Sequence, residues 1–189
     1  MEARIEDIIY TEEDYYALPE GRRAELIEGV FYDMTSPSLT HQRILGELFV
    51  EIHNYIKRKN GSCQAFPAPF AVKLFNDDKT IVEPDISVIC DRNKLTEKGC
   101  SGAPDWVIEI VSPSKSDHDY IKKLKLYIRA GVREYWIVNS ETRTVAVYKL
   151  GEGNFVPESY SFSDNISVGI YEDFQIQLSS LLPPVDPGV

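Results

Sequence analysis

The segment Asp105-Trp-Val-Ile-Glu-Ile-Val-Ser112 constrains the fold more than any other part of the chain. Its apolar residues occupy consecutive positions, which is typical of a central strand that is buried on both faces. Glu109 stands in the middle of this run. An ionised carboxylate buried there without a partner would cost several kcal/mol. The sequence therefore requires a cation, a network of hydrogen-bond donors or a metal ion beside Glu109.

A second carboxylate begins the preceding strand-like run. Asp85 follows Pro84 at the start of a β-branched segment that extends to Cys90. Two adjacent strands that each direct one carboxylate at the same place form a site for a hard divalent cation. The alternative for Asp85 is a strand-start carboxylate that accepts backbone N–H groups. For Glu109 the alternative is a buried ion pair without a metal.

The length and composition suit one globular domain. At 189 residues and 43% hydrophobic content, the chain can bury a sizeable core. We expect a single domain over residues 1–189, with a core at about 25–148 and a C-terminal β extension at about 151–182. No apolar run approaches the ~20 residues that span a bilayer, and the acidic N-terminus lacks the pattern of a secretory signal. These features predict a cytoplasmic protein with no membrane partner.

Charge and cysteine content narrow the function classes. The formal net charge of −10 argues against tight non-specific DNA binding without a metal, because such binding usually rests on a basic excess. Local basic clusters do occur, at 57–59 and 115–133. The three cysteines, Cys63, Cys90 and Cys100, are odd in number and form no CxxC pair. This pattern favours free thiols over a disulfide or a zinc site.

Hydrophobic periodicity predicts a mixed α/β (α+β) fold. A short helix at 11–20 and a hairpin that turns at Glu28-Gly29 precede the core. The core then reads helix, three strands, helix, strand, and a hairpin partner and further edge strands follow it. These core elements are expected at 41–59, 66–75, 82–90, 106–112, 117–130 and 134–138. A polar loop is expected at 91–104, and a strand at 144–148.

The carboxylates carry a family resemblance. Pro84-Asp85, followed by Glu109-Ile-Val111 on the next strand, resembles the PD-(D/E)XK nuclease superfamily. More closely, the chain resembles a large bacterial family of restriction-type endonucleases over about residues 11–148. The matching segments are Glu25-Leu-Ile-Glu-Gly29, His41, Pro84-Asp85, Glu109-Ile-Val-Ser-Pro-Ser114, Asp119 with Lys123, and Gly131-Val-Arg-Glu-Tyr-Trp136. The resemblance implies a restriction-endonuclease-like core and a metal-dependent DNA endonuclease.

One position departs from the superfamily pattern, which has a lysine two residues after the second acidic residue. Val111 stands there in this chain. In the following helix, the apolar arc comprises Tyr120, Ile121, Leu124, Leu126, Tyr127 and Ile128. Lys123 falls within this arc, whereas Lys122 and Lys125 fall outside it. In the resembling family a lysine at this place replaces the missing strand lysine, so we expect Lys123 to face the carboxylates. The alternative is an i,i+4 ion pair between Asp119 and Lys123.

The resemblance assigns roles to the central residues. Asp85 and Glu109, with a backbone carbonyl such as that of Ile110, would bind Mg²⁺ or Mn²⁺ and retain several waters. The metal would lower the pKa of a bound water and neutralise charge on the phosphoryl group. Lys123 would orient or deprotonate that water, or stabilise the developing negative charge.

Supporting roles are expected for neighbouring residues. His41 either faces the metal site as a phosphate ligand or proton carrier, or is a core histidine bonded to a carbonyl. Glu25 could support the metal ligands, although its strand pattern favours an exposed carboxylate. Ser112 and Ser114 could orient Glu109.

Three functions are compatible with these features. The leading hypothesis is a DNA endonuclease that uses Mg²⁺ or Mn²⁺. We expect a homodimer, because cutting both strands of a duplex requires two sites. The alternatives are a catalytically silent nuclease fold that serves as a binding or assembly module, motivated by Val111, and a metal-dependent hydrolase of another phosphodiester.

Overall fold

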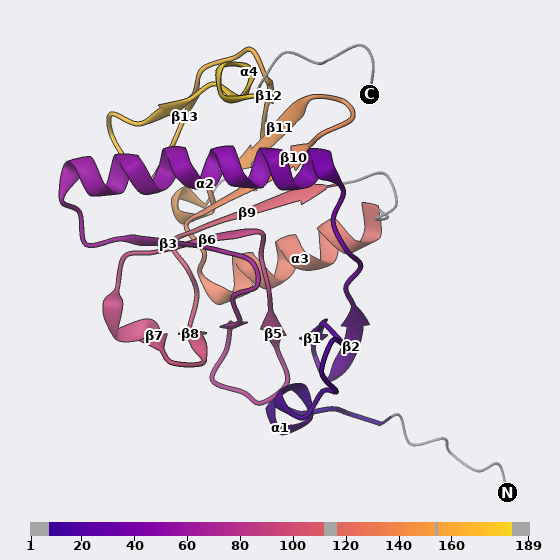
Figure 1. Cartoon of the computed structure of the whole chain (residues 1–189). Coiled ribbons are helices and arrows are strands. Elements are labelled where there is room, and N and C mark those ends of the chain that lie inside the picture. Colours follow the sequence, from indigo (N-terminus) through magenta and orange to yellow (C-terminus); the bar gives the residue numbers. More distant parts are fainter. Residues whose placement is uncertain (1–7, 112–116, 154, 183–189) are drawn as a thin grey trace, which may run out of the picture.

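The structure, a computed structural model, describes residues 8–111, 117–153 and 155–182, with backbone alone for 117–120 (Figure 1). The described residues form a central six-stranded sheet, flanked by two helices. Its strand order is β12-β11-β10-β9-β6-β3. These strands are β3 (Gln64–Pro67), β6 (Ile86–Ile89), β9 (Trp106–Val111), β10 (Glu134–Asn139), β11 (Thr144–Tyr148) and β12 (Glu158–Ser161). Strands β9 and β10 run parallel, while β6 lies antiparallel to β9.

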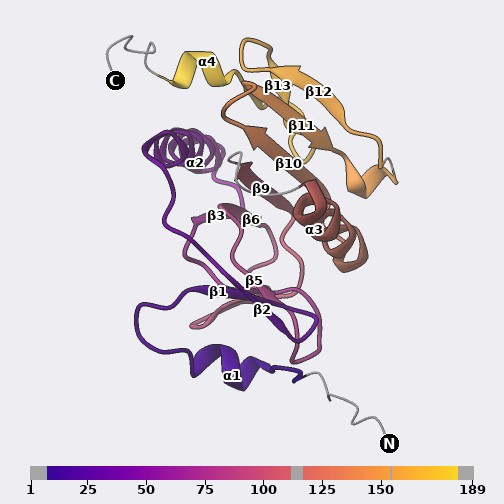
Figure 2. The same cartoon turned by 90° about the vertical axis from the view of Figure 1, so that its right-hand side faces the viewer.

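The two long helices cover opposite faces of this sheet, as Figure 2 shows. Helix α2 (Leu39–Lys59) packs on one face through a cluster that includes both tryptophans, Trp106 and Trp136. Helix α3 (Asp117–Ala130) packs on the other face, where Tyr127 is fully buried. The chain order α2, β3, β6, β9, α3, β10 confirms the predicted helix–strand–strand–strand–helix–strand core. Alternation along β9 directs Ile108 and Ile110 toward α2, so Val107, Glu109 and Val111 face α3.

A second sheet lies beside the central one, with strand order β2-β1-β5-β4-β8-β7 in the described residues. Helix α1 (Glu12–Tyr16) and the hairpin begin the chain on this side (Figure 2). The predicted hairpin turn is confirmed, because Glu28 and Gly29 adopt φ angles of 51° and 82°. The strands of this sheet are β1 (Ala24–Ile27), β2 (Val30–Asp33), β4 (Val72–Lys73), β5 (Ile81–Val82), β7 (Leu95–Thr96) and β8 (Gly99–Ser101).

Two expected strands are each divided between the sheets, which corrects the sequence analysis. The run 66–75 splits into β3 and β4 on either side of the cis bond between Ala68 and Pro69. The run 82–90 splits into β5 and β6 around Pro84. Proline cannot donate to a strand ladder, so each chain segment leaves one sheet at its proline and joins the other. The expected loop at 91–104 also holds structure, namely the 3-10 turn η1 (Arg92–Lys94), β7 and β8.

The cysteine prediction was wrong for two of the three residues. Cys63 and Cys90 form a disulfide, and Cys100 is a buried free thiol. The antiparallel register pairs Gln64 with Ile89, so the residues just outside this pair lie opposite each other. Their separation of 27 residues carries no sequence signature of that pairing. Across the described residues, no helix is long and apolar enough to cross a membrane.

The C-terminal part packs on α2. It comprises β12, β13 (Ile166–Ser167), β14 (Gln175–Ile176) and α4 (Leu178–Leu181). The preceding 3-10 turn η2 (Leu150–Glu152) instead buries Leu150 in the cluster on the α3 side. Phe162, Phe174 and Leu178 are buried in the same cluster as the α2 face of the central sheet. The ring of Phe174 stacks on Tyr55 of α2, with 3.9 Å between the ring centroids. The C-terminal extension and the central sheet therefore contribute to the same hydrophobic cluster.

We predict that the C-terminal strands and the central sheet unfold together. Phe174→Ala should lower the free energy of unfolding by about 3–5 kcal/mol, because it empties a buried site in the shared cluster. Tryptophan fluorescence reports on Trp106 and Trp136, and far-ultraviolet circular dichroism reports on the whole chain. The two urea transitions should coincide in both proteins. Separate transitions would contradict a single domain.

Candidate active site

The strand register brings Asp85 and Glu109 together. Strand β6 pairs with β9 so that Ile86 lies opposite Ile108 and Ser87 opposite Val107. Extending this antiparallel register by one residue places Asp85 opposite Glu109. Cross-strand neighbours have Cβ atoms about 5 Å apart on one face of a sheet. The spacing of the two acidic residues in the chain thus produces a pair of adjacent carboxylates.

Two donors from α3 compensate the buried Glu109 carboxylate. Its side chain is 6% exposed, and its Oε1 atom accepts hydrogen bonds from Lys123 Nζ and from the Tyr127 hydroxyl, each at 2.8 Å. Lys123 and Tyr127 lie four residues apart on one face of the helix. Two kinds of compensating group are therefore present beside Glu109: a cation, Lys123, and a hydroxyl donor, Tyr127.

Lys123 bridges two carboxylates. Its Nζ atom lies 2.9 Å from Glu25 Oε1, which also accepts the backbone N–H of Glu83 at 2.9 Å. Burial by itself lowers the pKa of Lys123, but the charges of Glu109 and Glu25 outweigh it and raise that pKa overall. The expected exposed position of Glu25 was wrong: the residue is 5% exposed. All four residues of strand β1 are buried, and the face that carries Glu25 lies against Lys123 of α3.

The Asp85 carboxylate is also held in place by neighbouring groups. Its Oδ2 atom accepts the Ile110 backbone N–H at 2.7 Å and lies 3.2 Å from His41 Nε2. His41 stands in the first turn of α2, which Ser38 caps by accepting the His41 backbone N–H. The second ring nitrogen of His41, Nδ1, is buried and has no hydrogen-bond partner in the part of the chain that the structure describes. Of the two alternatives for His41, the structure shows contact with Asp85.

Asp85 and Glu109 lie in one cavity of about 770 Å³. Its lining comes from both strands of the β1–β2 hairpin, the segment that joins β2 to α2, the first turns of α2, the turn at Ala68-Pro69, Asp85 before β6, the end of β9 and the start of α3. Asp85, His41 and Lys123 have side-chain exposures of 13%, 13% and 10%. The polar cluster is therefore largely shielded from solvent and borders the cavity.

Of the remaining residues named in the sequence analysis, the structure describes the side chains of some and not of others. Val111 is 4% exposed and lines the cavity, so an apolar side chain fills the usual lysine position. Ser112 and Ser114 lie outside the described residues, as does the side chain of Asp119. Ile121, placed in the apolar arc of the helix, is 54% exposed instead.

Sequence reasoning missed the contact made by Tyr127, which was assigned to the apolar arc alone. Its hydroxyl donates to Glu109, and burial raises its pKa well above the usual value, with a further upward contribution from Glu109. The signal was available, because Tyr127 lies one helical turn beyond Lys123 on the same face.

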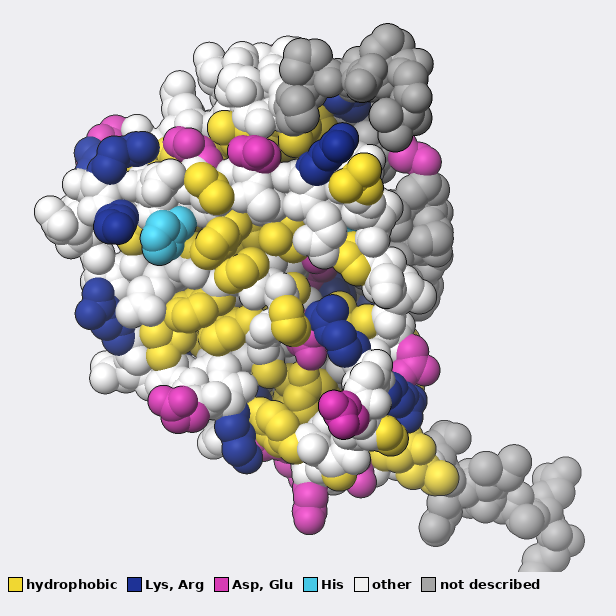
Figure 3. Space-filling view, in the orientation of Figure 1, with side chains coloured by type: hydrophobic (Ala, Val, Ile, Leu, Met, Phe, Trp, Pro, Cys, Tyr) yellow, Lys and Arg dark blue, Asp and Glu magenta, His cyan; other side chains and the backbone are white. Residues whose placement is uncertain are grey.

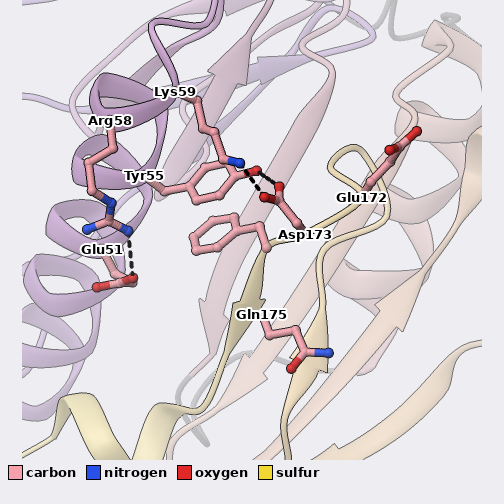
Figure 4. A pocket seen from close by; sticks show the side chains of 8 residues that line it. Glu51, Tyr55, Arg58, Lys59, Glu172, Asp173 and Gln175 are labelled. Carbon is pink, nitrogen blue, oxygen red and sulfur yellow. Dashed lines mark hydrogen bonds and ion pairs between the residues drawn. The ribbon is translucent and has the colours of Figure 1, made fainter.

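A second cleft, of about 480 Å³, lies between the end of α2 and the β13–β14 hairpin (Figure 4). Four of its charged side chains form two ion pairs. Asp173 accepts from the Tyr55 hydroxyl at 2.5 Å and pairs with Lys59, while Arg58 pairs with Glu51. Burial and the bond to Asp173 raise the pKa of Tyr55 to about 12. We therefore place the candidate site in the cavity of Asp85 and Glu109.

The fold and this cluster define a restriction-endonuclease-like protein. Residues 12–179 match the sequence model of the Uma2 family, described as "Putative restriction endonuclease". The chain belongs to this family, which confirms the resemblance drawn from its motifs.

Two individual proteins are also similar to this chain. The crystal structure of a "putative nuclease belonging to DUF820" from Anabaena variabilis superposes with a TM-score of 0.74 at 26% identity, covering 90% of this chain and 96% of that one. The uncharacterized protein slr1290 of Synechocystis sp. is 26% identical over 160 residues, which span 82% of this chain and 83% of that protein. The family and the structural neighbour both support a nuclease.

We predict that Lys123→Met destabilises the protein by about 3–5 kcal/mol at neutral pH, because it leaves two buried carboxylates without their cation. The difference should shrink on acidification, since protonated carboxyls need no cation. Toward alkaline pH, the raised pKa of Lys123 means that its contribution in the wild type begins to be lost only above about pH 10.4. Urea unfolding at several pH values measures both effects.

Lys125→Met is the matched control, because Lys125 is exposed on the same helix. It should change stability by less than about 0.5 kcal/mol. Equal stability of the two variants would contradict the bridging role of Lys123.

Proposed function

We propose that this protein is a metal-dependent endonuclease that hydrolyses phosphodiester bonds of DNA. The observation that carries the proposal is the convergence of Asp85 and Glu109 in one cavity, with the Lys123 ammonium held against Glu109. Membership of the Uma2 family supports the same reaction class.

The charges and donor atoms of the cluster fit Mg²⁺ or Mn²⁺. Glu25, Asp85 and Glu109 contribute three negative charges against the single positive charge of Lys123, which leaves an excess of two. Asp85 Oδ1 accepts no hydrogen bond from any described residue. In a strand, the N–H and C=O of one residue point to the same neighbour, so the Ile110 carbonyl points to the Asp85 side, as its N–H does.

The described residues include no group of three or more His, Cys, Asp or Glu side chains arranged to hold a metal. Two carboxylates and one carbonyl would therefore be the protein ligands. This small set suits Mg²⁺, which keeps several waters and commonly binds through one or two carboxylates and substrate phosphates. When bound, the ion would lower the pKa of a coordinated water and neutralise charge on the phosphoryl group.

The side chains around the carboxylates have separate roles in this proposal. Lys123 donates to Glu109, and an ammonium held between two carboxylates acts as a donor and a positive charge toward the developing oxyanion. Tyr127 fixes the position of Glu109 Oε1. His41 orients Asp85 through Oδ2, which leaves Oδ1 directed to other ligands.

A silent nuclease fold is the second candidate. The observation that favours it is the existing satisfaction of Glu109 Oε1 by Lys123 and Tyr127, together with Val111 in the strand-lysine position. In that case the cluster would serve stability, and the cavity would bind without cleaving. A hydrolase of another phosphodiester would share the metal site and differ only in its substrate.

We predict that wild-type protein cleaves supercoiled plasmid or circular single-stranded DNA with Mg²⁺ or Mn²⁺. Glu109→Gln and Asp85→Asn should each lower the rate at least about 100-fold, because each removes a charge placed at the reaction centre. Titration calorimetry with Mn²⁺ should show binding to wild type and loss of binding in Asp85→Asn.

Glu51→Gln is the control for these variants, because Glu51 belongs to the other cleft. It should retain both activity and Mn²⁺ binding. Cleavage that survives in Glu109→Gln would reject the assignment. Mn²⁺ binding without cleavage of DNA, but with hydrolysis of a generic phosphodiester, would select the other hydrolase.

Homodimerisation stays a prediction. Strands β3 and β12 are the edges of the central sheet and could each pair with a second copy. Molar mass from light scattering tests it directly: a value near twice 21.5 kDa supports the dimer, and a value near 21.5 kDa opposes it.

A further inference from the structure

The position of the carboxylates restricts what can reach them. Glu109 and Asp85 are 6% and 13% exposed, so a scissile phosphodiester has to enter the cavity. A cavity of about 770 Å³ has room for a nucleotide but not for both strands of a duplex, whose major groove alone is about 12 Å wide. The cavity instead has the size of pockets that enclose small organic ligands, about 300–1,000 Å³.

The walls of the cavity suit a nucleoside as well as a phosphate. Ile27, Leu45 and Pro69 add apolar side chains to its lining. An unpaired base presents apolar faces that can pack on such walls. In a regular duplex the base faces are stacked on one another, so they cannot pack on these apolar walls.

An aromatic ring and a cation stand together in the lining. Tyr32 of β2 is the cross-strand partner of Glu25, so its side chain lies on the same face as the site. It is 36% exposed. Lys122 donates to the Tyr32 hydroxyl, and its Nζ atom lies 4.3 Å from the ring centroid. Stacking on an aromatic ring beside a positive charge is the usual basis of single-strand binding.

The surface charge also disfavours an intact duplex as the substrate. The net charge of −10 gives no broad basic track for a duplex backbone. Figure 3 shows hydrophobic side chains gathered across the middle of one face, below α2, with basic side chains toward its margins. Stacking and apolar contact therefore have to provide much of the affinity.

We propose, on the basis of the proposed nuclease function, that the substrate is an unpaired strand of DNA, either single-stranded or within an open segment of a duplex. One nucleotide enters the cavity with its phosphate toward Asp85 and Glu109, and Tyr32 and Lys122 contact the strand as it enters. An intact duplex pays the cost of unpairing and unstacking before it can do so, and an open segment does not.

Three end-labelled substrates of one sequence test this proposal: a single strand, a fully paired duplex, and a duplex with a central unpaired bubble. With Mn²⁺ and excess enzyme, the single strand and the bubble should be cleaved at least about tenfold faster than the duplex, with bubble cuts inside the open segment. Equal rates for the paired duplex would overturn the proposal.

Measuring oligonucleotide binding tests the preference for unpaired DNA independently of the nuclease assignment. Fluorescence anisotropy with Ca²⁺ in place of Mn²⁺ follows the same oligonucleotides without requiring cleavage. If no substrate is cleaved, the nuclease function fails, yet tighter binding of the single strand would still support the cavity's preference. Equal binding of the duplex, or no binding of any substrate, would overturn it.

Variants of Tyr32 test the entry contact. Tyr32→Ala should weaken single-strand binding by about 5- to 100-fold, whereas Tyr32→Phe, which keeps the ring, should remain close to wild type. Tyr16→Ala is the matched control, because Tyr16 is similarly exposed and also lies beside a lysine, Lys98, but does not line the cavity. An equal effect of Tyr32→Ala and Tyr16→Ala would remove Tyr32 from the entry contact.

Discussion

The structure depends on the compensation of one buried carboxylate. Glu109 lies inside a central strand, where an unpaired charge would oppose folding. The Lys123 ammonium and the Tyr127 hydroxyl meet it from α3, and Glu25 holds Lys123 from the other sheet. A single cation thus connects the central strand, the helix on its face and the N-terminal hairpin. These three elements supply Glu25, Glu109 and Lys123 to the site.

Much of this arrangement is encoded locally. The apolar run around Glu109 identifies the central strand, and helical periodicity singles out Lys123 as the lysine that faces the sheet. Asp85 lies opposite Glu109 because the two consecutive strands of the central sheet that carry them pair antiparallel. These features were predictable because each depends on spacing within one element or between two neighbours.

Other features depend on contacts between distant segments. Glu25 is buried against Lys123 of α3, 98 residues away, and no pattern within β1 specifies that partner. The Cys63–Cys90 disulfide likewise follows from the pairing of β3 with β6. Proline divides two strand-like runs between the sheets, where hydrophobicity alone predicted continuous strands. Local pattern thus gives the elements, while the second sheet and its contribution to the site require the tertiary structure.

The central claim is that Asp85 and Glu109 bind a divalent cation. Soaking crystals of the wild-type protein in Mn²⁺ and measuring anomalous diffraction tests it most directly. The account predicts a peak within coordination distance of both carboxylates and the Ile110 carbonyl, with waters completing the shell. A cavity without a peak, with Lys123 still bonded to Glu109, would contradict the metal site and favour the silent fold.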